Sequence, residues 1–392
     1  MKQKKLIIFI PSIEGGGVER NLFEISNYLS NKINHIKVIT ADFHFKKKFN
    51  KKIELVSINK KNIPKFGRFI KYIICLILLF IEIIKNRNNL VFSFQANFYC
   101  TLLCKILGTK IIIRSNSSPS GWSNNSIKIK IFKFLFKLPD LIIVNSINFK
   151  KEIKKKFNVN SIFIYNPVNS KRIKKLSHEK ITFNFFRKNT LNIINVGRLV
   201  DQKDQMTLLK ALNSIKKRIK FRLLIIGNGK LKNFLINYIK SNYLQNSIKI
   251  IRFKKNPFPY YKKSNLLILS SKFEGLPNVL IEALILDKHV ISSDCPTGPS
   301  EILDNGKGGS LFKIGDFVSL GKKILFFKKR LKLNNFKLSF AKKRLDRFNH
   351  KKNLAKYLAV IKPQLLNTSI KKLDRFDYKI NLKKYLSVIK KI

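Results

Sequence analysis

The sequence has few acidic residues. Its 392 residues carry 21 aspartates and glutamates against 81 lysines and arginines, a formal net charge of +60 at pH 7. Such a balance is typical of proteins that bind nucleic acid or an anionic membrane surface. Lysine, asparagine, isoleucine and phenylalanine are abundant together, however, and all four have A/T-rich codons, so genome composition explains much of the lysine content. We therefore expect a cationic surface that favours anionic lipids and phosphorylated ligands, and no nucleic-acid partner.

Cysteine and histidine are also scarce. The four cysteines, at positions 75, 100, 104 and 295, form no metal-type cluster with histidine. Buried free thiols in a reducing, cytoplasmic compartment are the expected state. None of the five histidines lies in a motif, and the sequence has no Asp-x-Asp pair of the kind that holds a metal. We therefore expect no metal site.

No apolar run is long enough to cross a bilayer. The uninterrupted part of the most apolar stretch, residues 72–81, has 10 residues, against the roughly 20 that a span requires. Residues 69–84 are therefore expected to form a core helix under a sheet. Residues 127–138 alternate large apolar residues with lysines. They form either a basic amphipathic helix in a membrane interface or a helix on the sheet whose lysines reach solvent.

A dinucleotide fingerprint is missing too. The first apolar strand, residues 6–10, is followed by Gly15, Gly16 and Gly17 and then by a helical pattern, and not by Gly-x-Gly-x-x-Gly. Three consecutive glycines let the backbone come close to a ligand at the start of the helix. The other interpretation is a plain tight turn.

Two series of strand, turn and helix are present, and they predict two parallel α/β domains. Polar, lysine-rich residues after position 168 separate them as a linker. The predicted organisation is an N-terminal domain at 1–168, a C-terminal domain at 169–345 and a tail at 346–392. The predicted strands are 6–10, 36–40, 53–58, 90–94, 110–114, 141–145 and 161–165, then 191–196, 221–226, 247–253, 266–269 and 289–292.

One stretch of the second series carries the clearest chemistry. The strand at 266–269 is followed by a tight turn, and Pro277 stands where the first helical position is expected. The N-terminus of the helix is an anion site. Glu274 and Glu282 flank it, and Glu282 comes eight positions after Glu274. Carboxylates beside an anion site suit a ligand that carries both phosphates and hydroxyls, such as a nucleotide sugar.

The end of the predicted strand at 191–196 carries cationic residues. Residues 191–196 are followed by Gly197 and Arg198, with Lys203 five residues further on. Arginine offers a planar fork for phosphate, and lysine offers a point charge. Together these residues predict a diphosphate site.

The Glu-x7-Glu spacing, with Gly-Arg and a following lysine, resembles the signature of family 4 retaining glycosyltransferases of the GT-B fold. The resemblance implies two Rossmann-like domains that face each other across a cleft, with C-terminal helices. It implies catalytic roles for Glu274 on the sugar and for Arg198 and Lys203 on the diphosphate, and a ribose contact for Glu282. The remaining substrate-binding residues that it implies are Gly15, Gly16, Gly17, Arg114, Asn116, Gly197, Arg252, Phe253, Gly275, Leu276, Asn278 and Val279.

The resemblance also implies a reaction. A hexose or N-acetylhexosamine would pass from a nucleoside-diphosphate sugar, UDP-linked, to a glycan or polyprenyl-linked acceptor with retention of configuration. Residues 294–303 resemble loops of members that extend lipid-linked oligosaccharides for lipopolysaccharide and other polysaccharides. The expected place is the cytoplasm, at the inner face of the plasma membrane, without a cofactor or metal. Many relatives carry a histidine near Arg114, Ser115 and Asn116, and this chain has none there.

Two other classes of protein fit parts of the pattern. A sugar-nucleotide epimerase shares the architecture, but it needs a different acid–base set, and no histidine is placed for it. A basic nucleic-acid-binding protein fits the charge, but it does not predict paired glutamates beside an anion site.

The tail contains a repeat. Residues 345–362 recur at 373–390, and 13 of the 18 positions are identical. Each copy has the pattern of an amphipathic helix. In a GT-B enzyme such a terminal helix packs back onto the domains, so either copy could dock, and the other would be an exposed basic helix.

Overall fold

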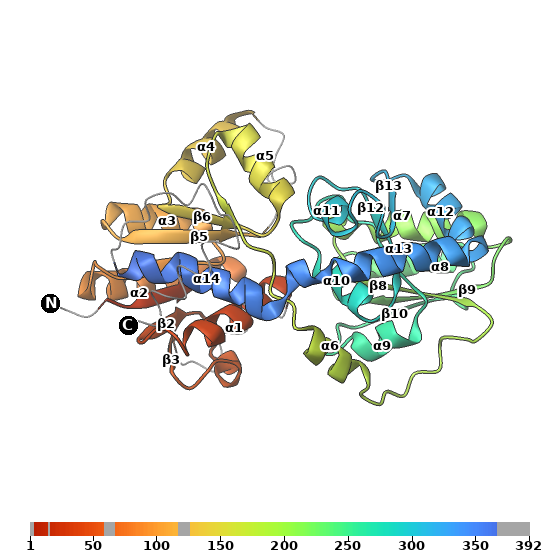
Figure 1. Cartoon of the computed structure of the whole chain (residues 1–392), viewed down its shortest axis with the longest axis horizontal. Coiled ribbons are helices and arrows are strands. Elements are labelled where there is room, and N and C mark those ends of the chain that lie inside the picture. The colour runs from red at the N-terminus through yellow and green to blue at the C-terminus, as the bar shows by residue number, and fades with distance from the viewer. Residues whose placement is uncertain (1–3, 15, 59–66, 117–125, 367–392) are drawn as a thin grey trace. The chain divides into compact units, whose positions relative to one another are not determined.

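A computed structural model of the chain describes residues 4–14, 16–58, 67–116 and 126–366. The chain divides into two compact units (Figure 1). The first comprises Met1–Ser115, Leu135–Ile143 and Lys351–Ile392, and the second comprises Asn116–Phe134 and Val144–His350. In the described residues, no helix is both long enough and apolar enough to cross a membrane.

The first sheet has seven strands in the order β3-β2-β1-β4-β5-β6-β7. β1 pairs in parallel with β2 and β4, β2 with β3, and β4 with β5. The strands are β1 (Leu6–Phe9), β2 (Ile36–Ile39), β3 (Ile53–Val56), β4 (Leu90–Ser93), β5 (Lys110–Ser115), β6 (Leu141–Val144) and β7 (Ile162–Phe163). The helical segments between them are α1 (Gly17–Leu29), η1 (Phe43–Lys48), α2 (Arg68–Lys85), α3 (Asn97–Ile106), α4 (Ser126–Lys137) and α5 (Ile147–Phe157).

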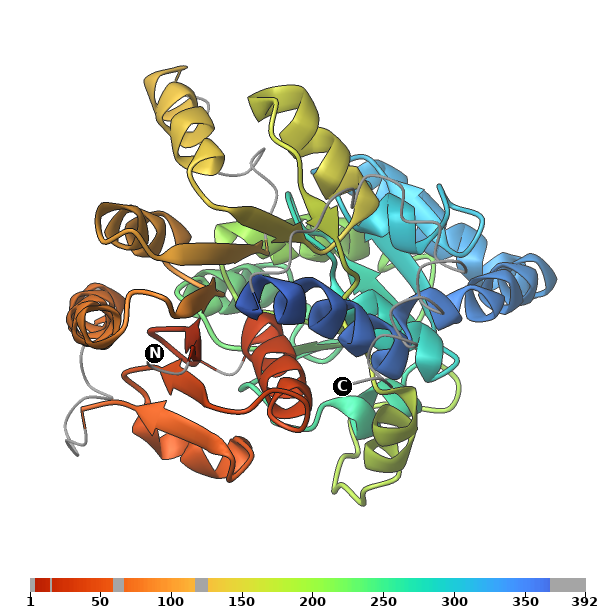
Figure 2. The same ribbon diagram turned by 60° about the vertical axis from the view of Figure 1, so that its left-hand side comes forward.

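Helices cover both faces of this sheet. The strand order reverses at β1, and parallel crossovers are right-handed, so α1 must lie on the opposite face from α2 and α3. Figure 2 shows this arrangement, with α1 in red and α2 and α3 in orange and brown. β1 is buried along its whole length, as expected for a strand covered on both faces.

The last described helix, α14 (His350–Leu365), belongs to the first unit from Lys351 onward. Its buried face includes Leu354, Tyr357 and Ile361. The Tyr357 hydroxyl accepts a hydrogen bond from Arg114 Nε at 2.8 Å. The first copy of the tail repeat is therefore docked, and the second copy lies outside the described residues.

The second sheet has six strands in the order β10-β9-β8-β11-β12-β13, and all of its pairings are parallel. The strands are β8 (Leu191–Val196), β9 (Phe221–Ile226), β10 (Ile248–Ile251), β11 (Leu266–Leu269), β12 (His289–Ser293) and β13 (Ser310–Phe312). The helical segments are α6 (Ser170–Ser177), η4 (Asp201–Lys203), α7 (Gln205–Ile215), α8 (Lys232–Ser241), α9 (Phe258–Lys263), α10 (Asn278–Ile285), α11 (Pro299–Ile302), α12 (Phe317–Lys329), α13 (Leu331–Lys343) and η5 (Leu345–Phe348).

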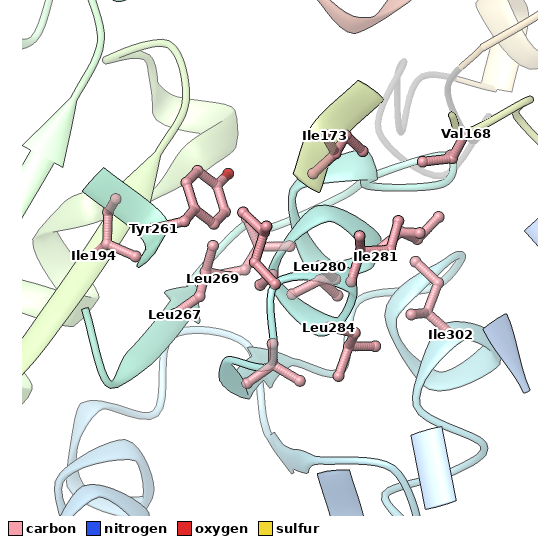
Figure 3. Packing of buried hydrophobic residues seen from close by; sticks show 14 of the residues in the cluster. Val168, Ile173, Ile194, Tyr261, Leu267, Leu269, Leu280, Ile281, Leu284 and Ile302 are labelled. Carbon is pink, nitrogen blue, oxygen red and sulfur yellow. The ribbon is translucent and has the colours of Figure 1, made fainter. Parts of the chain in front are cut away.

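Alternate residues of each strand feed two cores, one on each face of the second sheet. Ile193, Ile268 and the apolar side of α7 belong to one core. Ile194, Leu267 and Leu269 belong to the other, where they pack against α10 through residues such as Leu280 and Leu284 (Figure 3). α10 is therefore fixed to the sheet, and this packing positions its N-terminus.

The predicted fold class is confirmed: both sheets are parallel and covered by helices, and the last element of the described residues is a helix. Every predicted strand is found, and β13, which has only three residues, was missed. Two details of the prediction are wrong. Pro277 is the N-cap of α10, one residue before the helix. α2 is not a core helix throughout, because Ile77 is 56% exposed and Phe80 is 45% exposed.

Candidate active site

The strand order of the second sheet reverses between β8 and β11. The loops that follow these two strands leave the sheet at the same edge, next to each other. Ligands of open α/β sheets bind at such a switch point, outside the carboxyl ends of the strands. The loop after β8 carries Arg198 and Lys203, and the loop after β11 carries Glu274. The topology therefore brings the three residues predicted to be catalytic to one edge of the sheet.

Lys203 and Glu274 form an ion pair across the switch point. Lys203 Nζ lies 2.5 Å from Glu274 Oε1, and the two side chains are 17% and 8% exposed. Ser271 Oγ donates a hydrogen bond to the same carboxylate oxygen at 2.6 Å. Two donors thus fix the orientation of the carboxylate, which a precise contact to a ligand requires.

The two loops are also joined through backbone groups. Lys272 N donates to Gln202 O at 2.8 Å, and Gln202 Nε2 donates to Phe273 O at 2.9 Å. Ser270 Oγ donates to Lys203 O at 3.1 Å. These bonds position Lys203 relative to Glu274 independently of the ion pair.

Arg198 is exposed, and its Nη2 donates a hydrogen bond to Oε1 of Gln202, the neighbour of Lys203, at 3.4 Å. It lies on a turn that packs directly against the turn after β9, where two glycines are required. A Cβ atom on Gly227 would overlap the carbonyl oxygen of Gly197, and a Cβ atom on Gly229 would overlap that of Leu199. The close packing of the two turns holds the backbone of Arg198 and leaves its guanidinium at the surface.

The loop after β12 supports the loop before α10. Thr297 Oγ1 donates to Glu274 O at 2.6 Å. Gly298 has φ +91°, and a Cβ atom there would overlap the carbonyl oxygen of Gly275 and the ring of Pro277. The first N–H groups of α10 have no carbonyl partner within the helix, so this edge of the sheet combines an anion-binding helix end with the two cations.

Asn166 fixes the start of α10. Its Nδ2 donates to Leu276 O at 3.2 Å and to Asn278 Oδ1 at 2.6 Å. Leu276 is buried, whereas Asn278 and Val279 are half-buried. Of these three predicted binding residues, Asn278 and Val279 retain side-chain surface for a ligand.

Glu282 lies on α10, one turn or more beyond the helix start, and is 3% exposed. The Tyr261 hydroxyl donates to Glu282 Oε2 at 3.4 Å. The ribose contact implied for Glu282 stays a prediction.

The end of β10 lies beside the glycine turn after β9. Arg252 and Phe253 are both exposed. Phe253 N donates to Asn228 Oδ1 at 3.1 Å, and Asn228 stands between Gly227 and Gly229. These two predicted substrate-binding residues therefore belong to the same sheet edge as Arg198.

The predicted site residues of the N-terminal region have different surroundings. Gly16 is the N-cap of α1 and Gly17 is its first residue, and both are exposed; Gly15 lies outside the described residues. Asn116 belongs to the second unit, and its carbonyl oxygen occupies the position that a Cβ atom on Gly275 would take. Asn116 thus has a backbone contact with the loop of Glu274.

Arg114 is completely buried. Its Nε donates to the Tyr357 hydroxyl, and its guanidinium lies 5.7 Å from the centre of the Phe94 ring. Its backbone oxygen accepts a hydrogen bond from Asn97 Nδ2 at 3.0 Å. These contacts favour a structural role in joining β5 to α14 over the substrate contact implied by the resemblance.

Cys295 is a buried free thiol near Glu274. Burial, followed by the nearby Glu274 carboxylate, raises the pKa of Cys295, so this thiol stays protonated. Among the described residues, no group of three or more histidine, cysteine, aspartate or glutamate side chains could hold a metal ion.

Several residues that position the site were not predicted from the sequence. Five residues that were not predicted contact a predicted site residue or its loop: Ser271, Gln202, Thr297, Asn166 and Tyr261. Ser271 and Thr297 stand in stretches that the motifs already marked. Asn166 and Tyr261 gave no signal, because their contacts join different elements, 112 and 21 positions apart in the chain.

Two family models match the chain. Residues 15–172 match Glycosyltransferase Family 4, and residues 177–337 match Glycosyl transferases group 1. The second match contains the switch-point residues Arg198, Lys203, Glu274 and Glu282.

Two curated relatives are similar over different lengths. The chain is 35% identical to an uncharacterized glycosyltransferase of Methanocaldococcus jannaschii over 205 residues, which span 50% of each protein. It is 27% identical to the N-acetylgalactosamine-N,N'-diacetylbacillosaminyl-diphospho-undecaprenol 4-alpha-N-acetylgalactosaminyltransferase of Campylobacter jejuni, over 81% of this chain and 88% of that enzyme.

Solved structures share the fold. The crystal structure of Anabaena HepE in complex with UDP and glucose superposes with a TM-score of 0.72, covers 92% of this chain and 100% of that one, and is 16% identical in sequence. Together with the two family matches and the parallel sheets of both units, this shows that the chain belongs to the GT-B glycosyltransferases built from a family 4 domain and a group 1 domain.

Proposed function

We propose that this glycosyltransferase moves a sugar from a UDP-linked donor to a glycan carried on a polyprenyl diphosphate, with retention of configuration, in the synthesis of a cell-surface polysaccharide or glycoconjugate. The observation that carries the proposal is the Lys203–Glu274 pair at the switch point, with Arg198 exposed beside it. UDP is taken from the Anabaena complex. The lipid-linked acceptor is taken from the undecaprenol substrate named for the Campylobacter relative.

Each end of the donor has a matching group on the proposed site. Glu274, oriented by Lys203 and Ser271, would accept hydrogen bonds from hydroxyls of the sugar. Arg198 and the N–H groups at the start of α10 would bind the diphosphate. Glu282 would accept from the ribose, and the end of β10 at Arg252 would lie at the base.

The chemistry follows from where charge develops. The bond between the anomeric carbon and the diphosphate oxygen breaks, and negative charge builds on that oxygen. Arg198 and Lys203 would stabilise this charge, and preorganised cations at such a position lower the barrier. The acceptor hydroxyl passes its proton to the departing diphosphate oxygen as its own oxygen bonds to the anomeric carbon on the face that the diphosphate leaves. No metal is required in this scheme, since the two side chains and the helix end supply the positive charge.

A panel of nucleotide sugars tests the proposal. Binding is measured by thermal shift of the intact protein, and the products of the best donor are identified by mass spectrometry with and without polyprenyl-diphosphate glycans. Stabilisation by UDP-sugars, release of UDP and a mass gain on the acceptor equal to one sugar residue are expected. Formation of an epimer of the donor would favour the epimerase class, and the absence of any nucleotide-sugar binding would contradict the proposal.

A further inference from the structure

Helix α2 of the first unit buries two charged side chains among Cys75, Leu79 and Ile83, while its exposed side is largely apolar. The two charged residues are Lys71 and Glu82. The buried charges are paired: Lys71 Nζ lies 2.6 Å from Asp42 Oδ1, and Lys37 Nζ lies 2.8 Å from Glu82 Oε2. A helix on the surface of a water-soluble domain normally turns its charged face outward. The outer side of α2 is therefore suited to an apolar environment.

α2 packs beside α3, and their outer sides form one apolar face. A groove of about 400 Å³ runs between them. Its lining has a single polar side-chain atom, the Tyr99 hydroxyl, and consists of Ile73, Leu76, Ile77, Phe80, Tyr99, Leu102 and Leu103. Around the groove, Phe69 is 68% exposed, Ile84 is 50% exposed and Ile106 is 81% exposed. A contiguous apolar surface of this kind marks a site of interaction with a protein or a membrane.

Cations gather where α2 and α3 end. Lys85 closes α2, Lys105 lies in the last turn of α3, and the exposed Lys110 begins β5. The exposed Arg87 joins them, because Thr109 Oγ1 bonds to its backbone oxygen at 3.2 Å. The nearby acids are already paired, since Glu82 binds Lys37 and Lys85, and Asp140 binds Lys105. One end of the apolar face is thus bordered by net positive charge.

We propose that the α2–α3 face docks on an anionic lipid bilayer, with acyl chains against the groove and lipid phosphates against Lys85, Arg87, Lys105 and Lys110. Protein interfaces carry about one hydrogen bond per 100–200 Å², and this face offers almost no hydrogen-bonding groups. A symmetric pairing of two copies would bring the cationic borders of two strongly positive chains together. An anionic bilayer satisfies both the apolar face and its charged border.

The membrane proposal rests on the proposed function in one respect, since a polyprenyl-linked acceptor resides in a bilayer. The docking surface itself is inferred from α2 and α3 alone. It also differs from the sequence-based candidate for membrane contact at residues 127–138. In α4, Ile131 and Phe134 are exposed, but lysines alternate with them. The α2–α3 face, by contrast, has a continuous apolar groove.

Vesicle binding tests the proposal with the full chain. Flotation with vesicles of phosphatidylglycerol and phosphatidylcholine is compared for wild type, for the double variant Ile77→Ser/Phe80→Ser and for Phe336→Ser. Phe336 is 68% exposed in the second unit and serves as the matched control. Loss of two exposed apolar side chains that the bilayer would bury should weaken partitioning by at least ~10-fold, whereas the control should bind like wild type. Circular dichroism and UDP-sugar binding, both independent of lipid, should be unchanged in the double variant.

A fluorescent reporter checks the contact itself. Phe80→Trp is introduced after the only tryptophan is replaced by Trp122→Phe. A blue shift of its emission and quenching by brominated acyl chains are expected on anionic vesicles. Equal vesicle binding by wild type and the double variant, no binding by wild type, an unshifted reporter, or a dimer abolished by Ile77→Ser/Phe80→Ser would each overturn the proposal. None of these results bears on nucleotide-sugar binding, so a failure here is distinct from a failure of the proposed function.

Discussion

At the scale of single residues, Lys203 and Glu274 neutralise each other when no donor is bound. Lys203 carries three N–H donors, so it can hold Glu274 and still reach a phosphate oxygen. Glu274 in turn is positioned by Lys203 and Ser271, whose Oγ lies 2.6 Å away. The pair is expected to act as a unit in which the lysine orients the carboxylate and serves the diphosphate.

Replacing Glu274 by glutamine separates these two roles. Glu274→Gln keeps the shape of the side chain but removes the charge that Lys203 faces. The affinity for UDP should change by less than ~3-fold or increase, whereas sugar transfer should fall by about 100-fold, as for loss of one transition-state partner. Isothermal titration with UDP and initial rates of UDP release measure the two effects.

Ser271→Ala is a milder change at the same carboxylate, so its loss of transfer rate should be smaller than that of Glu274→Gln. It removes one hydrogen bond to a charged carboxylate, worth about 1.5 kcal/mol or more, so a loss of rate of at least ~10-fold is expected. A parallel loss of UDP affinity and transfer in Glu274→Gln would contradict the assignment of Glu274 to the sugar.

The sequence was sufficient to mark both residues of this pair, but not their contact. Lys203 and Glu274 are 71 positions apart. They meet because β8 and β11 are neighbours at the switch point, and that adjacency is a property of the whole sheet. The burial of Arg114 was not predictable either, since its partner Tyr357 is 243 positions away.

At the scale of elements, the turns after β8 and β9 depend on glycine to different degrees. A Cβ atom on Gly227 would overlap the Gly197 carbonyl oxygen, whereas a Cβ atom on Gly197 would meet only the aliphatic part of Lys203, at 3.5 Å or more. The packing of the turns therefore depends on Gly227 more than on Gly197.

Gly227→Ala should cost about 2–4 kcal/mol of unfolding free energy, because backbone must move to admit the methyl group. Gly197→Ala should stay within about 1 kcal/mol, since its contact is ordinary van der Waals packing. Urea unfolding of each variant, followed by circular dichroism, gives both values. Equal stability of the two variants would show that the turns are not packed as described.

A sequence pattern was enough to predict the buried strands but not the orientation of α2. Strands with continuous apolar runs, such as β1 and β11, were recognised because burial on both faces leaves a clear pattern. α2 was misjudged because its composition resembles that of a core helix. Its true orientation is set by Asp42 and Lys37, which bind its charged residues from other elements.

At the scale of the whole molecule, the net charge of +60 should produce non-specific adhesion to polyanions. Binding to duplex DNA is expected to be independent of sequence and to fall by roughly 10³–10⁵ between 50 and 200 mM salt if about 6–10 phosphates are contacted. Fluorescence anisotropy with two unrelated duplexes measures this. Salt-resistant binding that prefers one duplex would contradict this expectation and favour the alternative that the chain is a nucleic-acid-binding protein.

The central claim is that Arg198, beside the Lys203–Glu274 pair, stabilises the leaving diphosphate. The most direct test is the rate of UDP release from the preferred donor in wild type, Arg198→Ala and Arg218→Ala. Arg218 is an exposed arginine beyond the far end of α7 and is the matched control. Arg198→Ala should lower kcat by about 100-fold or more, and Arg218→Ala should leave it unchanged. An undiminished kcat in Arg198→Ala would contradict the account.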